Sequence, residues 1–198
     1  MIEPGSKLYR FLVWFAIGTA LFVVGSMVYQ YMMGPDDGAV LHYRRANMRL
    51  EDGQFKEALT DFNEYLKLVP GKATGYLGKG LALMGLNQFN EALEAIEVAI
   101  QIDPKLGAAW ANKGILLDRI GRHREALDHY NKALQLDREL SEGPGWLTRF
   151  FRSQWEKPPS IADRARYLET ELAKPETERL LRIPEKDSEQ RSYTYDGK

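Results

Sequence analysis

The most apolar stretch of the chain lies near its N-terminus. Between residues 11 and 33 no side chain is charged, and Gln30 is the one strongly polar residue. A helix of about 20 residues crosses a hydrocarbon core of roughly 30 Å. The pattern therefore predicts a transmembrane helix over residues 8–33, preceded by a short flank of residues 1–7.

A cleaved signal peptide is the alternative for this stretch. Such a peptide has an apolar core of about 7–15 residues, followed by small residues at its cleavage site. The run in this chain is longer and ends in Tyr-Gln-Tyr-Met-Met-Gly-Pro. Its length and its ending both favour an uncleaved membrane anchor.

Charges on either side of the helix bear on its orientation. Lys7 and Arg10 precede it and Asp36 and Asp37 follow it, which favours a cytoplasmic N-terminus. Arginines at positions 44, 45 and 49 favour the opposite orientation, because basic residues within about 15–20 positions of the helix are the ones that count. The balance slightly favours a single-pass protein whose remaining chain lies outside the cytoplasm.

Two glycines in the predicted membrane helix have two interpretations. Gly18 and Gly25 are two turns apart, so they share one side of the helix. A stripe of small residues allows close packing of another transmembrane helix. The alternative is ordinary lipid-facing composition, because glycine is common in membrane helices.

A different pattern follows a linker of residues 34–38. The chain aligns with itself at a spacing of 34 residues, in the segments 39–72, 73–106 and 107–140. Small residues recur at the eighth position (Ala46, Gly80, Gly114) and the twentieth (Ala58, Ala92, Ala126). Apolar triplets recur at i, i+3 and i+7: Leu59, Phe62 and Leu66; Leu93, Ile96 and Ile100; Leu127, Tyr130 and Leu134. The pattern predicts three antiparallel helix pairs with small residues at their crossings. Gly53 and Gly121 mark turns within pairs.

Other residue types also recur in phase. Position 4 holds Tyr76 and Trp110, position 24 holds Phe62 and Tyr130, position 27 holds Ala99 and Ala133, and position 32 holds Pro70 and Pro104. Over about half the chain, this pattern resembles the tetratricopeptide-repeat (TPR) family. The resemblance implies an all-α fold: the membrane helix, a short α-solenoid of three repeats, C-terminal capping helices at 141–183 and a polar, extended tail at 184–198.

The first repeat departs from the family pattern. His42 replaces the aromatic residue, Arg45 and Arg49 replace apolar residues, and Tyr65 replaces a small one. A terminal repeat has one face without a neighbour, so polar residues there suit a cap.

The resemblance also implies a protein-binding groove along the first helices of the repeats. The residues that map to it are Tyr43, Asn47, Leu50, Leu77, Leu81, Met84, Ile115, Asp118 and Arg119. The alternative is that the chain's own C-terminal segment fills this groove, because exposed apolar channels are unfavourable.

One TPR subtype binds a C-terminal carboxylate through basic and asparagine residues. The matching positions here are Tyr43, Asn47, Gly78, Ala108 and Asn112, of which Asn47 alone fits. We therefore expect an apolar segment or helix as the ligand.

A second apolar face is predicted beyond the third repeat. Trp146, Phe150, Phe151 and Trp155 share one side of a helix. This face either packs on the third repeat as a cap or contacts a membrane or a protein. Further along, Ser160 is predicted to cap a helix that reaches Ala173.

Charge and composition narrow the function. The net charge of −1 provides no basic field for nucleic acid, and the absence of cysteine removes disulfides and thiolate sites. His42, His123 and His129 form no metal-ligand pattern, and no catalytic or cofactor-binding motif is present.

We expect a non-enzymatic, membrane-anchored scaffold or accessory subunit that binds other proteins, within a membrane complex or during its assembly. The alternative is a membrane-anchored, chaperone-like or quality-control factor for apolar segments of translocated clients.

Overall fold

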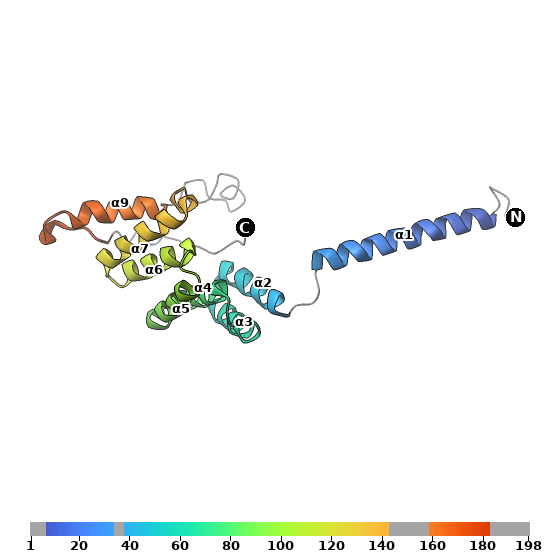
Figure 1. The fold of residues 1–198 in the computed structure, drawn as a ribbon, viewed down its shortest axis with the longest axis horizontal. Coiled ribbons are helices and arrows are strands. Elements are labelled where there is room, and N and C mark those ends of the chain that lie inside the picture. Colours follow the sequence, from blue (N-terminus) through green and yellow to red (C-terminus); the bar gives the residue numbers. More distant parts are fainter. Residues whose placement is uncertain (1–6, 34–37, 143–158, 183–198) are drawn as a thin grey trace.

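The computed structural model describes residues 7–33, 38–142 and 159–182, with the side chains of residues 29–33 excluded. Its first element is helix α1 (Lys7–Met33), which has no charged residue in its last turn. Every described side chain of α1 is exposed. Figure 1 shows α1 as one long continuous helix. The helix is long and apolar enough to cross a membrane, and a signal sequence near the N-terminus satisfies the same criteria.

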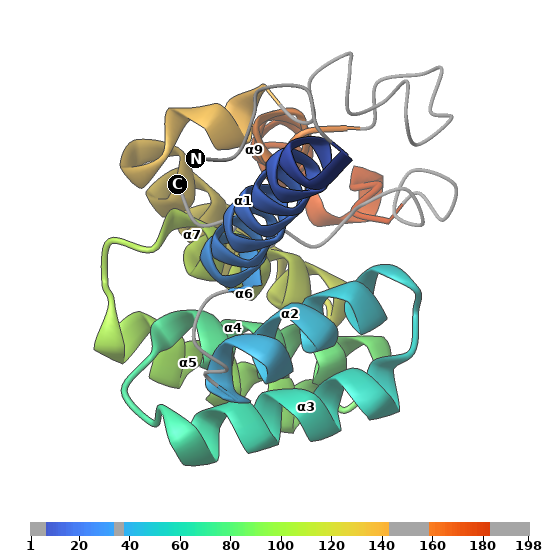
Figure 2. The ribbon, with the colours of Figure 1, turned by 90° about the vertical axis from the view of Figure 1, so that its right-hand side faces the viewer.

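Three antiparallel helix pairs follow. They are α2 (Gly38–Glu51) with α3 (Phe55–Leu68), α4 (Ala73–Gly85) with α5 (Phe89–Ile102), and α6 (Gly107–Arg119) with α7 (His123–Leu136). Each helix from α2 to α7 packs against its neighbours in the chain (Figure 1, Figure 2). The all-α fold class predicted from the repeat is thus confirmed for the described residues.

Small residues let the helices of each pair approach closely. A Cβ atom added at Gly80 would lie 2.6 Å from Ile96 Cγ1, and one at Gly114 would lie 2.6 Å from Tyr130 Cδ1. Ala46, Ala58 and Ala92 are fully buried in equivalent places. The predicted role of these positions as helix crossings is confirmed.

The second helix of each pair supplies the centre of the core. Phe62, Ile96 and Tyr130 are fully buried, and each is the middle member of a predicted apolar triplet. Apolar side chains spaced at i, i+3 and i+7 lie on one helical face, so burial of that face holds α3, α5 and α7 against their partners.

The turns within the three pairs share one backbone conformation. Gly53 and Gly121 have φ of 72° and 86°, and Asn87 has φ of 60° at the equivalent position of the second repeat. Glycine adopts this left-handed conformation without steric strain, and asparagine tolerates it better than most residues. The glycine turns are confirmed, and Asn87 is the third member of the set.

Helix α9 (Ile161–Leu172) covers the last repeat. It follows the 3₁₀ helix η1 (Arg138–Ser141), and it packs on α7 through a face that includes Ile161, Ala165 and Leu168, which are buried. Ser160 and Asp163 form the reciprocal hydrogen bonds of a capping box at its start, so the predicted N-cap is confirmed. A second 3₁₀ helix, η2 (Glu176–Glu178), follows α9.

Candidate functional site

The residues predicted to line the groove lie on α2, α4 and α6, the first helices of the three pairs. Those at its centre are deeply buried: Leu77, Leu81, Met84 and Ile115 are at most 4% exposed. They belong to one core cluster, which also contains residues of α9 and has Leu181 packed against it. In this structure the centre of the predicted groove is therefore part of the core.

The accessible predicted residues lie at the two ends of this surface. Tyr43, Asn47 and Leu50 on α2 are partly exposed, and Arg119 on α6 is exposed. The Tyr43 ring packs edge-on against Phe62, with centroids 6.1 Å apart. Asn47 Nδ2 donates to the Tyr43 carbonyl at 3.0 Å, so its amide nitrogen is engaged within its own helix.

Asp118, predicted as a ligand-facing groove residue, joins three helices instead. Its carboxylate is buried and accepts hydrogen bonds from Arg164 of α9, at 2.6 Å from Nε and 3.0 Å from Nη2. His123 Nδ1 lies 2.7 Å away, and the Tyr130 hydroxyl donates at 3.3 Å. The residue thus links α6, α7 and α9.

The partnership of Arg164 with Asp118 was not predicted from the sequence. One signal was available: Asp118 follows Ile115, Leu116 and Leu117, which are all apolar. A carboxylate on a helix face that is buried needs a cationic or hydrogen-bonding partner, because desolvation of an unpaired charge is unfavourable. No local spacing identifies a partner 46 residues away.

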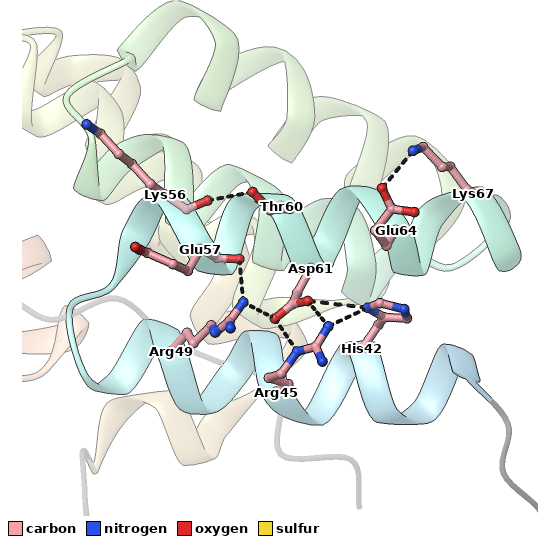
Figure 3. Close-up of polar contacts among 9 residues, drawn as sticks. All are labelled: His42, Arg45, Arg49, Lys56, Glu57, Thr60, Asp61, Glu64 and Lys67. Atoms are coloured by element: carbon pink, nitrogen blue, oxygen red, sulfur yellow. Dashed lines mark hydrogen bonds and ion pairs between the residues drawn. The ribbon is translucent and has the colours of Figure 1, made fainter.

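The first repeat carries a second buried carboxylate, Asp61 of α3, which is 2% exposed. Figure 3 shows it facing His42, Arg45 and Arg49 of α2. Arg45 of α2 donates to both of its oxygens, with Nε 2.8 Å from Oδ2. Arg49 Nη1 lies 2.6 Å from Oδ2, and His42 Nδ1 lies 3.3 Å from Oδ1. These are three of the residues that depart from the family pattern, and together they make a polar interface between α2 and α3.

Electrostatics favour the ionised form of Asp61. The hydrogen bond from Arg45 holds the pKa of Asp61 below its usual value, against the opposing effect of burial. The three basic side chains are partly exposed, with Arg45 at 37%. The polar character expected of a terminal cap thus takes the form of an ion-pair cluster.

The remaining predicted contact residues lie on α1 and beyond the third repeat. A Cβ atom added at Gly18 or at Gly25 would meet no atom beyond its own helix within 4 Å among the described residues. Trp146, Phe150, Phe151 and Trp155 lie outside the described residues, as does the tail at 184–198. Both the membrane-helix packing and the second contact face stay predictions.

This geometry is that of an α-solenoid, built from repeated pairs of antiparallel helices with small residues at each crossing. Two family models, both described as tetratricopeptide repeat, match residues 43–107 and 107–140. Residues 43–140 are therefore tetratricopeptide repeats, as the sequence pattern predicted. Repeats of this kind act as scaffolds for protein–protein interaction. Among curated proteins, none matches the sequence.

Solved structures share the fold. The first TPR domain of Spaghetti (RPAP3), bound to an HSP90 peptide, has a TM-score of 0.55 and 15% identity, over 71% of this chain and 97% of that one. The first TPR domain of human RPAP3 has a TM-score of 0.54 and 16% identity, over 68% and 92%. The Arabidopsis OM64 TPR domain has a TM-score of 0.50 and 24% identity, over 52% and 85%. At these identities the likeness concerns the fold.

Proposed function

We propose that this chain is a membrane-anchored adaptor, whose repeats hold a protein subunit or assembly client of a membrane complex. The observation that carries the proposal is the order of its parts. A helix long and apolar enough to cross a membrane, exposed along its described length, immediately precedes a tetratricopeptide-repeat domain.

The short connection between anchor and repeats supports this function. Helix α1 ends at Met33 and α2 begins at Gly38. A fully extended chain spans at most about 3.6 Å per residue, so the first repeat stays within roughly 20 Å of the end of α1. Confinement of this kind raises the effective concentration of the repeats toward membrane-bound partners without any new contact.

The first repeat has an accessible apolar surface on α2. On α2 the side chains of Val40, Leu41 and Met48 are 44%, 54% and 58% exposed, and Arg44 lies among them on the same side of the helix. Apolar side chains beside an arginine are typical of the centres of protein interfaces. We infer that a partner binds across α2 and the accessible ends of the groove, with the repeat domain outside the cytoplasm.

A chaperone-like function has less support. It needs an open apolar channel, whereas Leu77, Leu81, Met84 and Ile115 are buried. Among the described residues, no group of three or more histidine, cysteine, aspartate or glutamate side chains is placed to hold a metal ion.

Affinity purification of the tagged full chain from gently solubilised membranes tests the proposal. Arg119→Glu changes an exposed charge at the end of the groove, and Lys132→Glu changes another exposed charge, on α7, as the matched control. We expect a stoichiometric partner with the wild type and with Lys132→Glu, and a reduced amount with Arg119→Glu. A mixed, substoichiometric set of clients that neither variant alters would contradict an adaptor function.

A further inference from the structure

The segment after α9 turns back and runs along that helix. Helix α9 ends at Leu172, η2 occupies Glu176–Glu178, and the backbone is extended at Arg179, with φ of −76° and ψ of 127°. The next three residues, 180–182, contact both α9 and the end of α6. We call residues 179–182 the return segment.

Three side chains of α9 hold the main chain of the return segment. The Leu180 N–H donates to Glu171 Oε2 at 2.9 Å, and the Tyr167 hydroxyl donates to the Leu180 carbonyl. Arg164 Nη2 donates to the Leu181 carbonyl at 3.1 Å. Residues 164, 167 and 171 lie on one helical face, so they form a clamp for an extended backbone. Main-chain hydrogen bonds of this kind give affinity for an extended peptide whatever its side chains.

The side chains of residues 180–182 differ in their exposure and in their contacts. Leu180 is 65% exposed, whereas Leu181 packs against the main core cluster. Arg182 Nη2 donates to the Arg119 carbonyl at 2.6 Å. That carbonyl lies in the last turn of α6, where unpaired carbonyls and the negative end of the helix dipole favour a cation. The site therefore accepts any residue other than proline at the position of Leu180, an apolar residue at that of Leu181 and a basic residue at that of Arg182.

The clamp side chains are also held by groups outside the return segment. Arg164 is fixed by Asp118, and its guanidinium lies 5.4 Å from the centre of the Tyr167 ring. Glu171 is paired with Lys174 at 2.6 Å. None of these contacts involves residues 179–182, so we expect the clamp to keep its arrangement when the return segment leaves, and a preorganised site loses less entropy on binding.

We propose that α9 and the end of α6 form a binding site for an extended peptide with an apolar residue followed by a basic one, and that residues 180–182 occupy this site as a displaceable internal ligand. The proposal rests on the proposed function in one respect, that a partner supplies the displacing segment. Its chemistry differs from that of a carboxylate-binding TPR site, because the ligand's cation rather than a terminal carboxylate is recognised.

A labelled synthetic peptide with the sequence of residues 174–186 tests the proposal on the purified full chain in detergent. The tethered segment has an effective concentration on the order of millimolar, so the wild type should resist the peptide. In a Leu181→Ala, Arg182→Ala double variant the internal ligand is weakened, and the peptide should bind at least about tenfold more tightly than to the wild type. Adding Tyr167→Phe to the double variant removes one clamp donor and should weaken peptide binding about fivefold.

Two results would overturn the proposal. One is equal binding to the wild type and the double variant. The other is no binding to a double variant whose helical circular dichroism matches that of the wild type and whose thermal unfolding is still cooperative. A peptide with aspartate in place of the leucine equivalent to Leu181 is the control for specificity.

If the double variant does not fold, hydrogen exchange of the Leu180 amide in the wild type tests the proposal. Millimolar peptide should accelerate this exchange, since Glu171 then binds the added chain, and an unchanged rate would contradict the proposal. These measurements use neither membrane nor partner, so their failure is distinct from a failure to co-purify a partner.

Discussion

Arg164 of α9 forms a bidentate ion pair with Asp118 of α6, a residue 46 positions earlier in the sequence. The side chains of Arg164 and Asp118 are 10% and 2% exposed, so both charges are largely removed from water. A charge in such a place is tolerated because its partner is present. The pair therefore ties the capping helix to the third repeat.

Loss of Arg164 should leave the buried Asp118 carboxylate without its arginine partner. We expect Arg164→Ala to lower the free energy of unfolding by about 3 kcal/mol, the lower end of the range for breaking a buried pair, because His123 and Tyr130 still contact the carboxylate. Denaturant unfolding in detergent measures this change.

Arg166→Ala is the matched control for that experiment. Arg166 is 74% exposed and pairs with Asp163 at the surface, where such pairs contribute at most about 1 kcal/mol. Equal destabilisation by the two variants would show that the Asp118 pair does not hold α9 in place.

The left-handed turns predict a second set of stability changes. Gly121→Ala should lower the free energy of unfolding by about 1 kcal/mol, because alanine is strained at a φ of 86°. A Cβ at Gly121 meets no atom of another part of the described chain within 4 Å, so the cost comes from the local backbone conformation alone.

Asn87 offers the converse change at the equivalent turn. Asn87→Gly should leave stability unchanged or slightly raise it, since glycine relieves the same backbone strain. Thermal melts of the two variants measure the difference, and a clear destabilisation by Asn87→Gly would mean that the asparagine side chain stabilises this turn by other contacts.

The Asp61 cluster predicts a pH dependence of stability. The pKa of Asp61 is lowered in the folded state, chiefly by its hydrogen bond from Arg45, so ionised Asp61 stabilises the fold. This contribution is complete above the unfolded value of about 4 and is lost as the pH falls through the lower folded value.

Asp61→Asn isolates this effect from those of the other carboxylates. Wild type should be more stable than the variant at pH 7, and the difference should shrink as the pH falls below about 4. Unfolding curves recorded from pH 7 to pH 3 measure the difference, and a constant difference across this range would contradict the assignment.

The predicted packing stripe on α1 gives a further test. Gly25→Leu should reduce recovery of a neighbouring transmembrane protein, because a larger side chain prevents close helix approach. Ala20→Leu alters the opposite side of the same helix and should leave recovery unchanged. Neither substitution should alter the melting temperature of the repeats, since no atom beyond α1 lies within 4 Å of a Cβ at Gly25 among the described residues.

The fold was predictable because the residues that pack the repeats recur at fixed, short spacings in the sequence. Gly80 and Gly114 allow the helices of their pairs to cross closely, and Phe62, Ile96 and Tyr130 fill the core where the periodicity places them. A 34-residue period repeated in phase leaves few alternatives for such residues.

The candidate site was less predictable because its contacts are long-range. The family pattern placed Asp118 on a binding surface, and only the return of α9 onto the third repeat makes it a partner of Arg164. Likewise, Leu77 and Met84 have the positions of groove residues, yet their burial depends on packing that no local pattern encodes.

The central claim is that the repeats themselves recognise a partner, whatever further contact the membrane helix makes. The direct measurement is quantitative mass spectrometry of proteins bound to the tagged full chain and to a chain that starts at Pro35. The account predicts that the same partner binds both, with Arg119→Glu reducing its amount in each. Loss of the partner from the chain that starts at Pro35, when that chain is folded, would contradict the account and assign recognition to α1.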